Sequence, residues 1–436
     1  MSVFRKISKI HFIGIGGIGM SGIAELLLNL GFEISGSDLH ESDIIKRLES
    51  LGISIQIGHH PDNIGSAEVV VYSSAIPQEN SEIVMAHQKG LPVIRRAEML
   101  GELISMKETS IGVGGTHGKT STSSMIGSIL AHGKKDPTMV VGGLVKSLDS
   151  NSKLGDGNII VVEADEFDRS FLALNPTIGV ITNIELEHTD CYADLDDLQK
   201  TFLQFAHAVP FYGEVILCID SPALFEISSE ITRPITTYGF SDFADYQAIN
   251  FSFDAFASSY SIKHNDEIIG DITLKEGIKS YAGVRRRFEL KGIESDIMVV
   301  DDYAHHPTEV SATLQAAKSG WNRRIISIFQ PHLFSRTQEF FREFGQALLE
   351  SDLVLVTDVY PAREKPISGI TGEMIYKELD RLGHANAYYV PDLDDVIEKL
   401  DQIVQPGDLV ITLGAGNIWR YSEKYIQHLS KAKTEV

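Results

Sequence analysis

The sequence predicts an α/β protein of three domains, and three observations carry this prediction. The chain has 436 residues, more than a single hydrophobic core supports. Short apolar runs alternate with segments of helical spacing, a pattern typical of parallel sheets covered by helices. Many of these runs end in polar residues, as ligand-binding strands do in open α/β sheets. We expect domains at residues 1–105, 106–286 and 287–436.

A glycine-rich turn follows the first strand. The sequence predicts a strand from Lys9 to Ile15 and a helix from Met20 to Leu30 that ends at Gly31. Between them lie four glycines: Gly14, Gly16, Gly17 and Gly19. This order predicts a Rossmann-like domain, in which N–H groups at the helix start bind a diphosphate.

Polar side chains follow the later strands of this domain. Strands are predicted at Phe32 to Ser35, Glu68 to Tyr72 and Val93 to Arg96. The residues at their ends are candidates for binding a ligand: Ser37, Asp38, Ser73, Ser74, Arg95 and Arg96. Asp38 lies about 20 residues past the glycines, where an acid contacts a ribose hydroxyl. Because any nucleotide diphosphate fits such a turn, both a nicotinamide or flavin cofactor and a nucleotide substrate stay open.

A second phosphate-binding turn opens the central domain. A strand that ends at Val113 precedes it, and helical spacing resumes at Met125. The turn contains Gly115, Thr116, His117, Gly118, Lys119, Thr120 and Ser121. The strict P-loop pattern has glycine where Val113 stands, so this turn departs from it at one position. We still expect a P-loop ATPase-like domain, with Lys119 on the β/γ-phosphates and Thr120 on Mg²⁺.

Acidic and histidine side chains follow two further strands of this domain. The strand at Asn158 to Val162 leads to Glu163, and the strand at Ile178 to Thr182 leads towards His188. An acid at the tip of a buried strand beside a P-loop typically contacts Mg²⁺. We therefore predict Glu163 as a metal ligand and His188 as a metal or phosphate contact.

The basic triplet 285–287 marks the start of the last domain. Strands are predicted at Ile297 to Val300, Arg324 to Phe329, Leu353 to Thr357 and Asp408 to Leu413. Each is followed by polar residues and by a helical segment, which predicts a third, Rossmann-like sheet.

Composition limits the classes of partner. The net charge of −22 disfavours binding to nucleic acid or to an anionic membrane. Two cysteines form no disulfide framework, and no apolar run approaches the ~20 residues that span a bilayer. We expect a soluble cytoplasmic protein, either a monomer or a weak homodimer.

The motifs resemble, in order, those of the Mur ligases of peptidoglycan synthesis. They comprise 115–120, 163–166, 182–188, 302–307 and 413–416. The N-terminal glycines, Gly36 to Asp38, Arg95 to Glu98 and Gln330 to His332 look most like members that join L-alanine to UDP-N-acetylmuramate. The resemblance implies ATP and Mg²⁺ as cofactors, and phosphorylation of a carboxylate to an acyl phosphate that the amine of L-alanine attacks.

The resemblance also implies roles for individual residues. The N-terminal turn would hold the UDP group, and Arg287 and Asp302 would contact ATP. His305, His306, His332 and Arg336 would lie on the amino-acid side. A histidine is the natural acceptor for the ammonium proton near neutral pH, and we place it at His305 or His306.

Two features depart from the family pattern. A segment expected to contribute to adenine binding is missing between Lys275 and Glu276, and we expect that the native protein contains it. Leu333-Phe334 stands where many members have Arg-Tyr, so more of the cationic role falls on Arg336.

Three alternatives stay open. A recycling ligase would join UDP-N-acetylmuramate to a ready-made peptide, and a wider pocket would distinguish it. An NAD-dependent dehydrogenase would explain the N-terminal glycines but not Lys119 or Glu163. A non-catalytic protein switched by ATP would release no phosphate.

Overall fold

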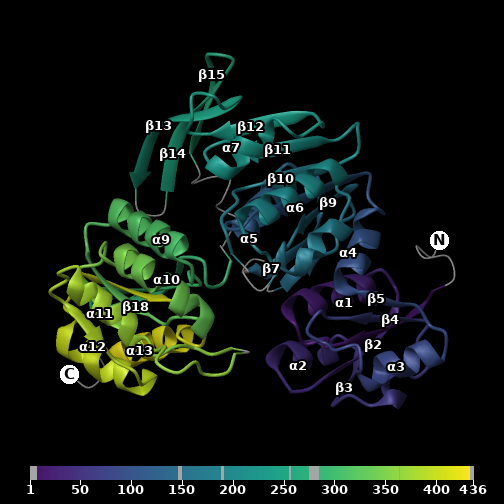
Figure 1. The fold of residues 1–436 in the computed structure, drawn as a ribbon, viewed down its shortest axis with the longest axis horizontal. Coiled ribbons are helices and arrows are strands. Elements are labelled where there is room, and N and C mark those ends of the chain that lie inside the picture. Colours follow the sequence, from purple (N-terminus) through teal and green to yellow (C-terminus); the bar gives the residue numbers. More distant parts are fainter. Residues whose placement is uncertain are drawn as a thin grey trace. The chain divides into compact units, whose positions relative to one another are not determined.

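The structure is a computed structural model that describes residues 7–145, 150–187, 191–254, 257–273, 284–362 and 364–432. It contains three sheets, each accompanied by helices, and this confirms the α/β class (Figure 1). No helix among the described residues combines the length and the apolar character needed to cross a membrane.

The first sheet is parallel, with strand order β3-β2-β1-β4-β5. Its strands are β1 (Lys9–Ile13), β2 (Glu33–Asp38), β3 (Ser54–Ile57), β4 (Val69–Tyr72) and β5 (Val93–Arg95). The helices are α1 (Ile18–Asn29), α2 (Asp43–Ser50), η1 (Pro61–Ile64), α3 (Ser81–Gln88) and α4 (Arg96–Ile104). The second strand is longer than predicted, so Ser37 and Asp38 belong to β2 rather than to the loop after it.

The second sheet has ten strands in the order β15-β14-β13-β12-β11-β10-β6-β9-β7-β8. They are β6 (Thr109–Gly114), β7 (Thr138–Val145), β8 (Ser150–Lys153), β9 (Ile159–Glu163), β10 (Ile178–Ile181), β11 (Glu214–Cys218), β12 (Ile235–Gly239), β13 (Tyr246–Asp254), β14 (Ala257–His264) and β15 (Glu267–Thr273). The helices are α5 (Lys119–His132), η2 (Phe167–Ala173), α6 (Leu195–Ala208) and α7 (Pro222–Ser228). The apolar strand β6 lies between β10 and β9, so the turn that follows β6 starts at the centre of the sheet.

The third sheet has the order β16-β17-β21-β18-β19-β20. Its strands are β16 (Glu289–Glu294), β17 (Ile297–Asp302), β18 (Arg324–Phe329), β19 (Leu353–Val356), β20 (Ala387–Tyr389) and β21 (Asp408–Leu413). The helices are α9 (Pro307–Gly320), α10 (Phe334–Leu348), α11 (Glu373–Arg381), η3 (Leu393–Asp395), α12 (Val396–Ile403) and α13 (Trp419–Ala432). All its pairs are parallel except β16 with β17.

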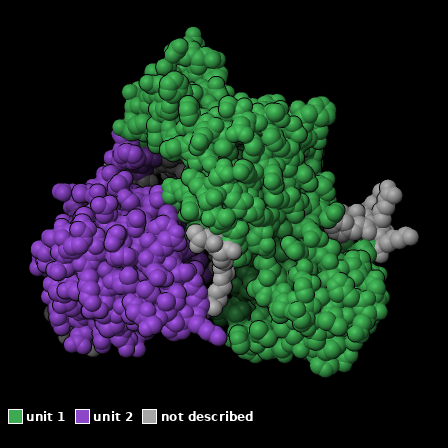
Figure 2. Space-filling model, in the orientation of Figure 1, with its two compact units in different colours: residues 1–251, 259–284 green, residues 252–258, 285–436 purple. Residues whose placement is uncertain are grey.

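The chain divides into two compact units, which Figure 2 colours separately. Unit 1 contains residues 1–251 and 259–284, and unit 2 contains residues 252–258 and 285–436. The first two sheets fall in unit 1 because they share one apolar cluster, which includes Leu103 and Ile104 of α4 together with Phe171 of η2. Helix α4 packs so closely on η2 that a Cβ at Gly101 would lie 2.6 Å from the Ala173 carbonyl oxygen.

Candidate functional site

The N-terminal glycine turn is held by the end of β2. The N–H groups of Gly14 and Ile15 donate to the carbonyl oxygen of Ser37, at 2.8 and 3.1 Å. Gly14 has a φ of +77°, a conformation that glycine adopts without steric cost. The N–H of Gly16 donates to Asp38 Oδ2 at 2.8 Å, and α1 then begins with Gly17 as its N-cap. One oxygen of the predicted ribose-binding acid therefore supports the turn itself.

The remaining N-terminal candidates lie in two groups. Ser73 packs against the turn, because a Cβ at Gly14 would lie 3.4 Å from Ser73 Cβ. Arg96 lies over the start of α1, where a Cβ at Gly19 would be 3.0 Å from its Nη1. Arg96 Nη2 also lies 3.9 Å from Asp165 Oδ2, which connects the first sheet to the acidic end of β9.

Other candidates of this group differ in exposure. Ser74 and Arg95 are exposed, and a hydrogen bond with the Tyr72 hydroxyl raises the pKa of Arg95. Ser37 is instead fully buried, and its hydroxyl donates to Glu82 rather than facing the turn. The structure therefore does not place the Ser37 side chain with the other candidates.

The P-loop turn joins β6 to α5. Gly115 and Gly118 have φ values of +130° and +81°, and Gly118 is the N-cap of α5. The segment after β10 braces this turn, since His117 N donates to Asn183 Oδ1 at 2.8 Å and Thr182 Oγ1 donates to His117 O at 2.6 Å. The turn is thus shaped by backbone and side-chain partners, and it presents the start of a helix, which favours anions.

Lys119 folds back over its own turn. Its Nζ donates to the carbonyl oxygens of Gly115 and Thr116, at 2.7 and 3.0 Å, and to Glu166 at 2.9 Å. Burial disfavours the charge of Lys119, but nearby carboxylates, Glu166 first, outweigh burial and raise its pKa. Glu166 is only 1% exposed, and burial raises its pKa to about 7 despite Lys119. The lysine stays charged and has a carboxylate partner that titrates near neutral pH.

The predicted metal ligands Thr120 and Glu163 both lie beside β7. A Cβ at Gly143 would lie 3.1 Å from Thr120 Cγ2, and Glu163 Oε2 accepts a hydrogen bond from Gly142 N at 2.7 Å. His188 lies outside the described residues.

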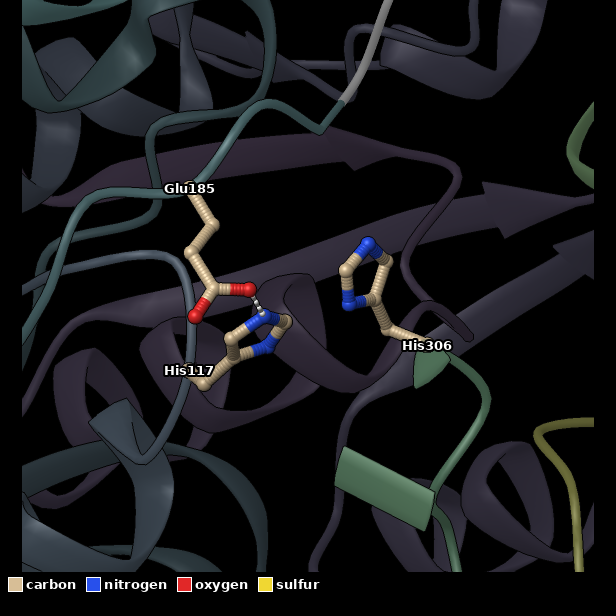
Figure 3. A group of neighbouring side chains, drawn as sticks. All are labelled: His117, Glu185 and His306. Atoms are coloured by element: carbon tan, nitrogen blue, oxygen red, sulfur yellow. Dashed lines mark ion pairs between the residues drawn. The ribbon is translucent and has the colours of Figure 1, made fainter. Parts of the chain in front are cut away.

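His117 forms an ion pair within unit 1. Its Nε2 lies 3.3 Å from Glu185 Oε2, the contact drawn as a dashed line in Figure 3. The backbone N–H of Glu185 donates to Thr116 Oγ1 at 2.9 Å, so Glu185 belongs to the frame of the P-loop turn. His306, also labelled in Figure 3, belongs to unit 2.

In unit 2, Arg286 and Arg287 have different surroundings. Arg286 is internal: its guanidinium bonds to Asp301 at 3.2 Å and to the carbonyl oxygen of Gly414. Arg287 is partly exposed and lies 5.2 Å above the ring of Tyr303. Asp302 is buried, which raises its pKa to about 6, and its oxygens accept backbone N–H bonds from Phe288 and Ala304.

The predicted histidines gather at the carboxyl end of the third sheet. His305 and His332 have ring centroids 5.8 Å apart, and His332 stacks at 5.8 Å on Tyr360. His306 is the N-cap of α9 and packs on Phe340, while Arg336 lies in the first turn of α10. An open cavity of about 500 Å³ adjoins this end, and Tyr360 is among its lining residues.

Comparison with known proteins bears on all three sheets. Three family models match the chain: the Mur ligase family catalytic domain over residues 9–108, the Mur ligase middle domain over 113–275, and the Mur ligase glutamate ligase domain over 286–416. A UDP-N-acetylmuramate–L-alanine ligase of Geotalea uraniireducens (strain Rf4) is 47% identical, over 98% of this chain and 99% of its own length. The chain belongs to the Mur ligase family.

Other members agree with this assignment. The protein of the same name from Syntrophus aciditrophicus (strain SB) is 47% identical over 95% of this Mur ligase and 92% of its own length. The crystal structure of a UDP-N-acetylmuramate–alanine ligase from Thermotoga maritima aligns with a TM-score of 0.81 and 28% identity, over 97% of this chain and 99% of that chain. A murein peptide ligase from Psychrobacter arcticus, at a TM-score of 0.66 and 23% identity over 97% and 98% of the two chains, shows the shared fold.

The junction of Lys275 and Glu276, where the family pattern has a further segment, is outside the described residues of this Mur ligase. The alignment with the Geotalea protein extends over 455 positions, more than the 436 residues of this chain. That relative therefore has residues without a counterpart here.

Glu166 was not among the predicted site residues of this Mur ligase. It lies three positions after Glu163, in a string rich in acids, and that string was the available signal. Sequence alone does not say which acid of the string turns inward, because the string lies between β9, which ends at Glu163, and η2, which begins at Phe167, and so has no strand or helix periodicity. Only the folded chain shows that Glu166 is the partner of Lys119.

Proposed function

We propose that this Mur ligase joins L-alanine to the carboxylate of UDP-N-acetylmuramate in an ATP-dependent reaction. The observation that carries the proposal is the 47% identity, over nearly the full length, to proteins of that name. The glycine-rich turn between β6 and α5, with Lys119 and Thr120 at the start of the helix, supports the use of ATP. Identity to the peptide-joining ligase is only 23%, so that alternative has the weaker support, and membership of a ligase family leaves no support for the dehydrogenase alternative.

The chemical difficulty is that two anions, a carboxylate and the γ-phosphate, must meet. We propose that Lys119, whose charged Nζ lies at the turn between β6 and α5, neutralises phosphate charge. We propose that incoming phosphates displace Glu166 from Lys119. Phosphoryl transfer to the carboxylate then gives an acyl phosphate, which has a good leaving group.

Mg²⁺ fits the residues beside β7. Thr120 and Glu163 offer a hydroxyl and a carboxylate oxygen, which are hard donors of the kind that Mg²⁺ prefers, and the adjacent glycines 142 and 143 leave room that a side chain would fill. Bound there, Mg²⁺ would neutralise phosphate charge. We propose both residues as its ligands, with His188 as a further candidate.

The sugar nucleotide and the amino acid are assigned to different sheets. We propose that the N-terminal turn holds the UDP group through its N–H groups, with Arg96 as a nearby cation. His305 and His306 are candidates to accept the ammonium proton of L-alanine, and Arg336 is the candidate for its carboxylate. Arg287 is the proposed ATP contact in unit 2. Asp302 has its oxygens bonded to the backbone, so we propose that it acts by shaping that loop.

A phosphate-release assay tests the proposal. The full chain is supplied with ATP, Mg²⁺ and UDP-N-acetylmuramate, and then with L-alanine, glycine, L-serine or a tripeptide. We expect release that requires the sugar nucleotide and is fastest with L-alanine. Faster turnover of the tripeptide would favour the recycling ligase, and no release with any amine would contradict the ligase assignment.

A further inference from the structure

A buried carboxylate lies behind the N-terminal turn. Glu82, in the first turn of α3, is 0% exposed, as are its neighbours His11 and Ser37. Its Oε2 accepts from His11 Nε2 at 3.0 Å and from Ser37 Oγ at 2.7 Å. Its Oε1 accepts from Asn63 Nδ2 at 2.8 Å and from the backbone N–H of His60 at 3.1 Å. Four hydrogen bonds thus converge on one side chain.

Burying an ionised carboxylate costs free energy, because the charge loses its hydration. A buried carboxylate is tolerated only when hydrogen bonds or opposite charges replace its water. These bonds are strong enough here to lower the pKa of Glu82 to about 2, although burial acts in the opposite direction. Glu82 therefore stays ionised inside the domain over the physiological range of pH.

Apart from His11, which lies within β1, the partners of Glu82 lie at the carboxyl end of the sheet. His60 and Asn63 follow β3, Ser37 is at the end of β2, and Glu82 itself follows β4. The loop after β1 joins the same group through backbone bonds, since Ser37 O accepts the N–H groups of Gly14 and Ile15. This is the end of the sheet at which open α/β folds bind ligands.

Ser37 and Asp38, adjacent residues of β2, lie between Glu82 and the glycine turn. Successive side chains of a strand point to opposite faces, and here Ser37 points to Glu82 while Asp38 bonds to Gly16 N. A strand end held through Ser37 thus has Asp38 fixed on the other face. Backbone pairing with β1 and β3 also reaches this strand end, so loss of the anchor removes the side-chain contribution to the position of Asp38.

We infer that Glu82 is a positioning residue for the sugar nucleotide, because it anchors the strand end that shapes the glycine turn. The inference rests on the proposed function, in which this turn binds the UDP group. Glu82 does not touch the substrate; it acts through Ser37 and Asp38.

The test compares Glu82→Gln with the wild type and with Glu68→Gln. Glu68 is a matched control: its carboxylate accepts backbone N–H bonds from Ser8 and Lys9, at the opposite end of the same sheet. We expect Glu82→Gln to raise KM for UDP-N-acetylmuramate about tenfold, with kcat and the KM values for ATP and L-alanine changed less than about twofold. Glu68→Gln should leave every constant near its wild-type value.

A second variant and a second measurement cover the case in which Glu82→Gln folds poorly. Ser37→Ala keeps the carboxylate but removes the link to it, together with the contact between Ser37 Oγ and His59 Nδ1 at 3.1 Å, and should show the same selective rise in KM. Calorimetry with UDP as the probe measures the turn without turnover, so it separates this inference from the proposed reaction. An inactive wild type would overturn the proposed function. Unchanged UDP affinity in both variants, or equal losses for all three substrates, would overturn the role of Glu82.

Discussion

Lys119 donates hydrogen bonds to its own loop and to Glu166, whereas the proposed reaction requires it to face phosphate oxygens. The two sets of partners are compatible because an ammonium group has three donors that reorient easily. Glu166 accepts one of these donors, so the buried charge of Lys119 has a partner of opposite charge.

Replacement of Lys119 should abolish most of the activity. We expect Lys119→Ala to slow phosphate release at least about 100-fold, because it removes a positive charge from the developing phosphate charge. Circular dichroism should show the fold unchanged. Lys135→Ala, at an exposed lysine beyond the other end of α5, serves as the control with an unchanged rate. Full activity in Lys119→Ala would contradict the P-loop assignment.

The pKa of Glu166 makes nucleotide affinity depend on pH in a defined direction. Burial raises this pKa to about 7, so Glu166 is mostly protonated at pH 6 and mostly ionised at pH 8. The ionised form competes with phosphate for Lys119, and Glu166→Gln imitates the protonated form. We expect the variant to bind ADP about tenfold more tightly than the wild type at pH 8 and equally well at pH 6.

Calorimetry at the two pH values measures this difference. The ionisation of ADP itself cancels, because both proteins are titrated with the same nucleotide. Glu108→Gln alters an exposed carboxylate next to the start of β6 and should follow the wild type at both pH values. A ratio of wild-type to Glu166→Gln affinities that does not change with pH would show that Glu166 does not compete for Lys119.

At the scale of elements, the turn between β6 and α5 needs two glycines for different reasons. Gly118 has a φ of +81°, and a Cβ there would meet no atom closer than Thr122 Oγ1 at 4.0 Å. At Gly115 the φ is +130°, and a Cβ would overlap Thr182 Oγ1. Gly118 is therefore restricted by backbone conformation alone, whereas Gly115 is also restricted by packing against the segment after β10.

The two alanine variants should separate these effects. Gly118→Ala should lower the free energy of unfolding by about 1 kcal/mol, the cost of a left-handed conformation for a residue with a Cβ. For Gly115→Ala the loss should be about 3 kcal/mol or more, since steric overlap adds to backbone strain. Urea unfolding followed by circular dichroism measures both, and equal losses would refute the packing argument.

At the scale of the whole molecule, the apolar clusters that cover the three sheets divide between the two units. The apolar cluster of unit 1 contains residues from both the first and the second sheet. Unit 2 has clusters of its own on the two faces of the third sheet, with Val300 and Phe344 in one and Val299 and Tyr425 in the other. Cutting the chain after residue 105 would therefore expose apolar residues of the cluster that the first two sheets share. Cutting it after residue 284 would leave this cluster intact.

Fragments should behave accordingly. Residues 285–436 expressed alone should unfold cooperatively in urea, because their apolar residues are covered within the fragment. Residues 1–105 alone should be much less stable than in the full chain, since α4 and α1 lose their partners in the second sheet. A fragment 1–105 as stable as the first sheet in the intact protein would contradict the shared core.

Predictions from the sequence succeeded where local rules apply. The strands ending at Ile13, Tyr72 and Phe329 were located because each is an apolar run rich in β-branched residues that is followed by glycine or by polar residues. The end of β2 was misplaced because Gly36 weakens the strand pattern, although pairing with β1 extends the strand to Ser37 and pairing with β3 extends it to Asp38. Strands β12, β13 and β14 were not predicted, because polar residues are frequent in them and no continuous apolar run marks them.

The motifs of the chain were therefore enough to indicate three α/β sheets, two glycine-rich turns between a strand and a helix, and the family, since each depends on residues close together in sequence. The pairing of Lys119 with Glu166 and the convergence of four hydrogen bonds on Glu82 depend on residues far apart in sequence. Whether such groups meet is decided by packing of helices on sheets and by the cost of burying a charge without partners. Those terms act only on the folded chain, which is why the tertiary structure alone showed them.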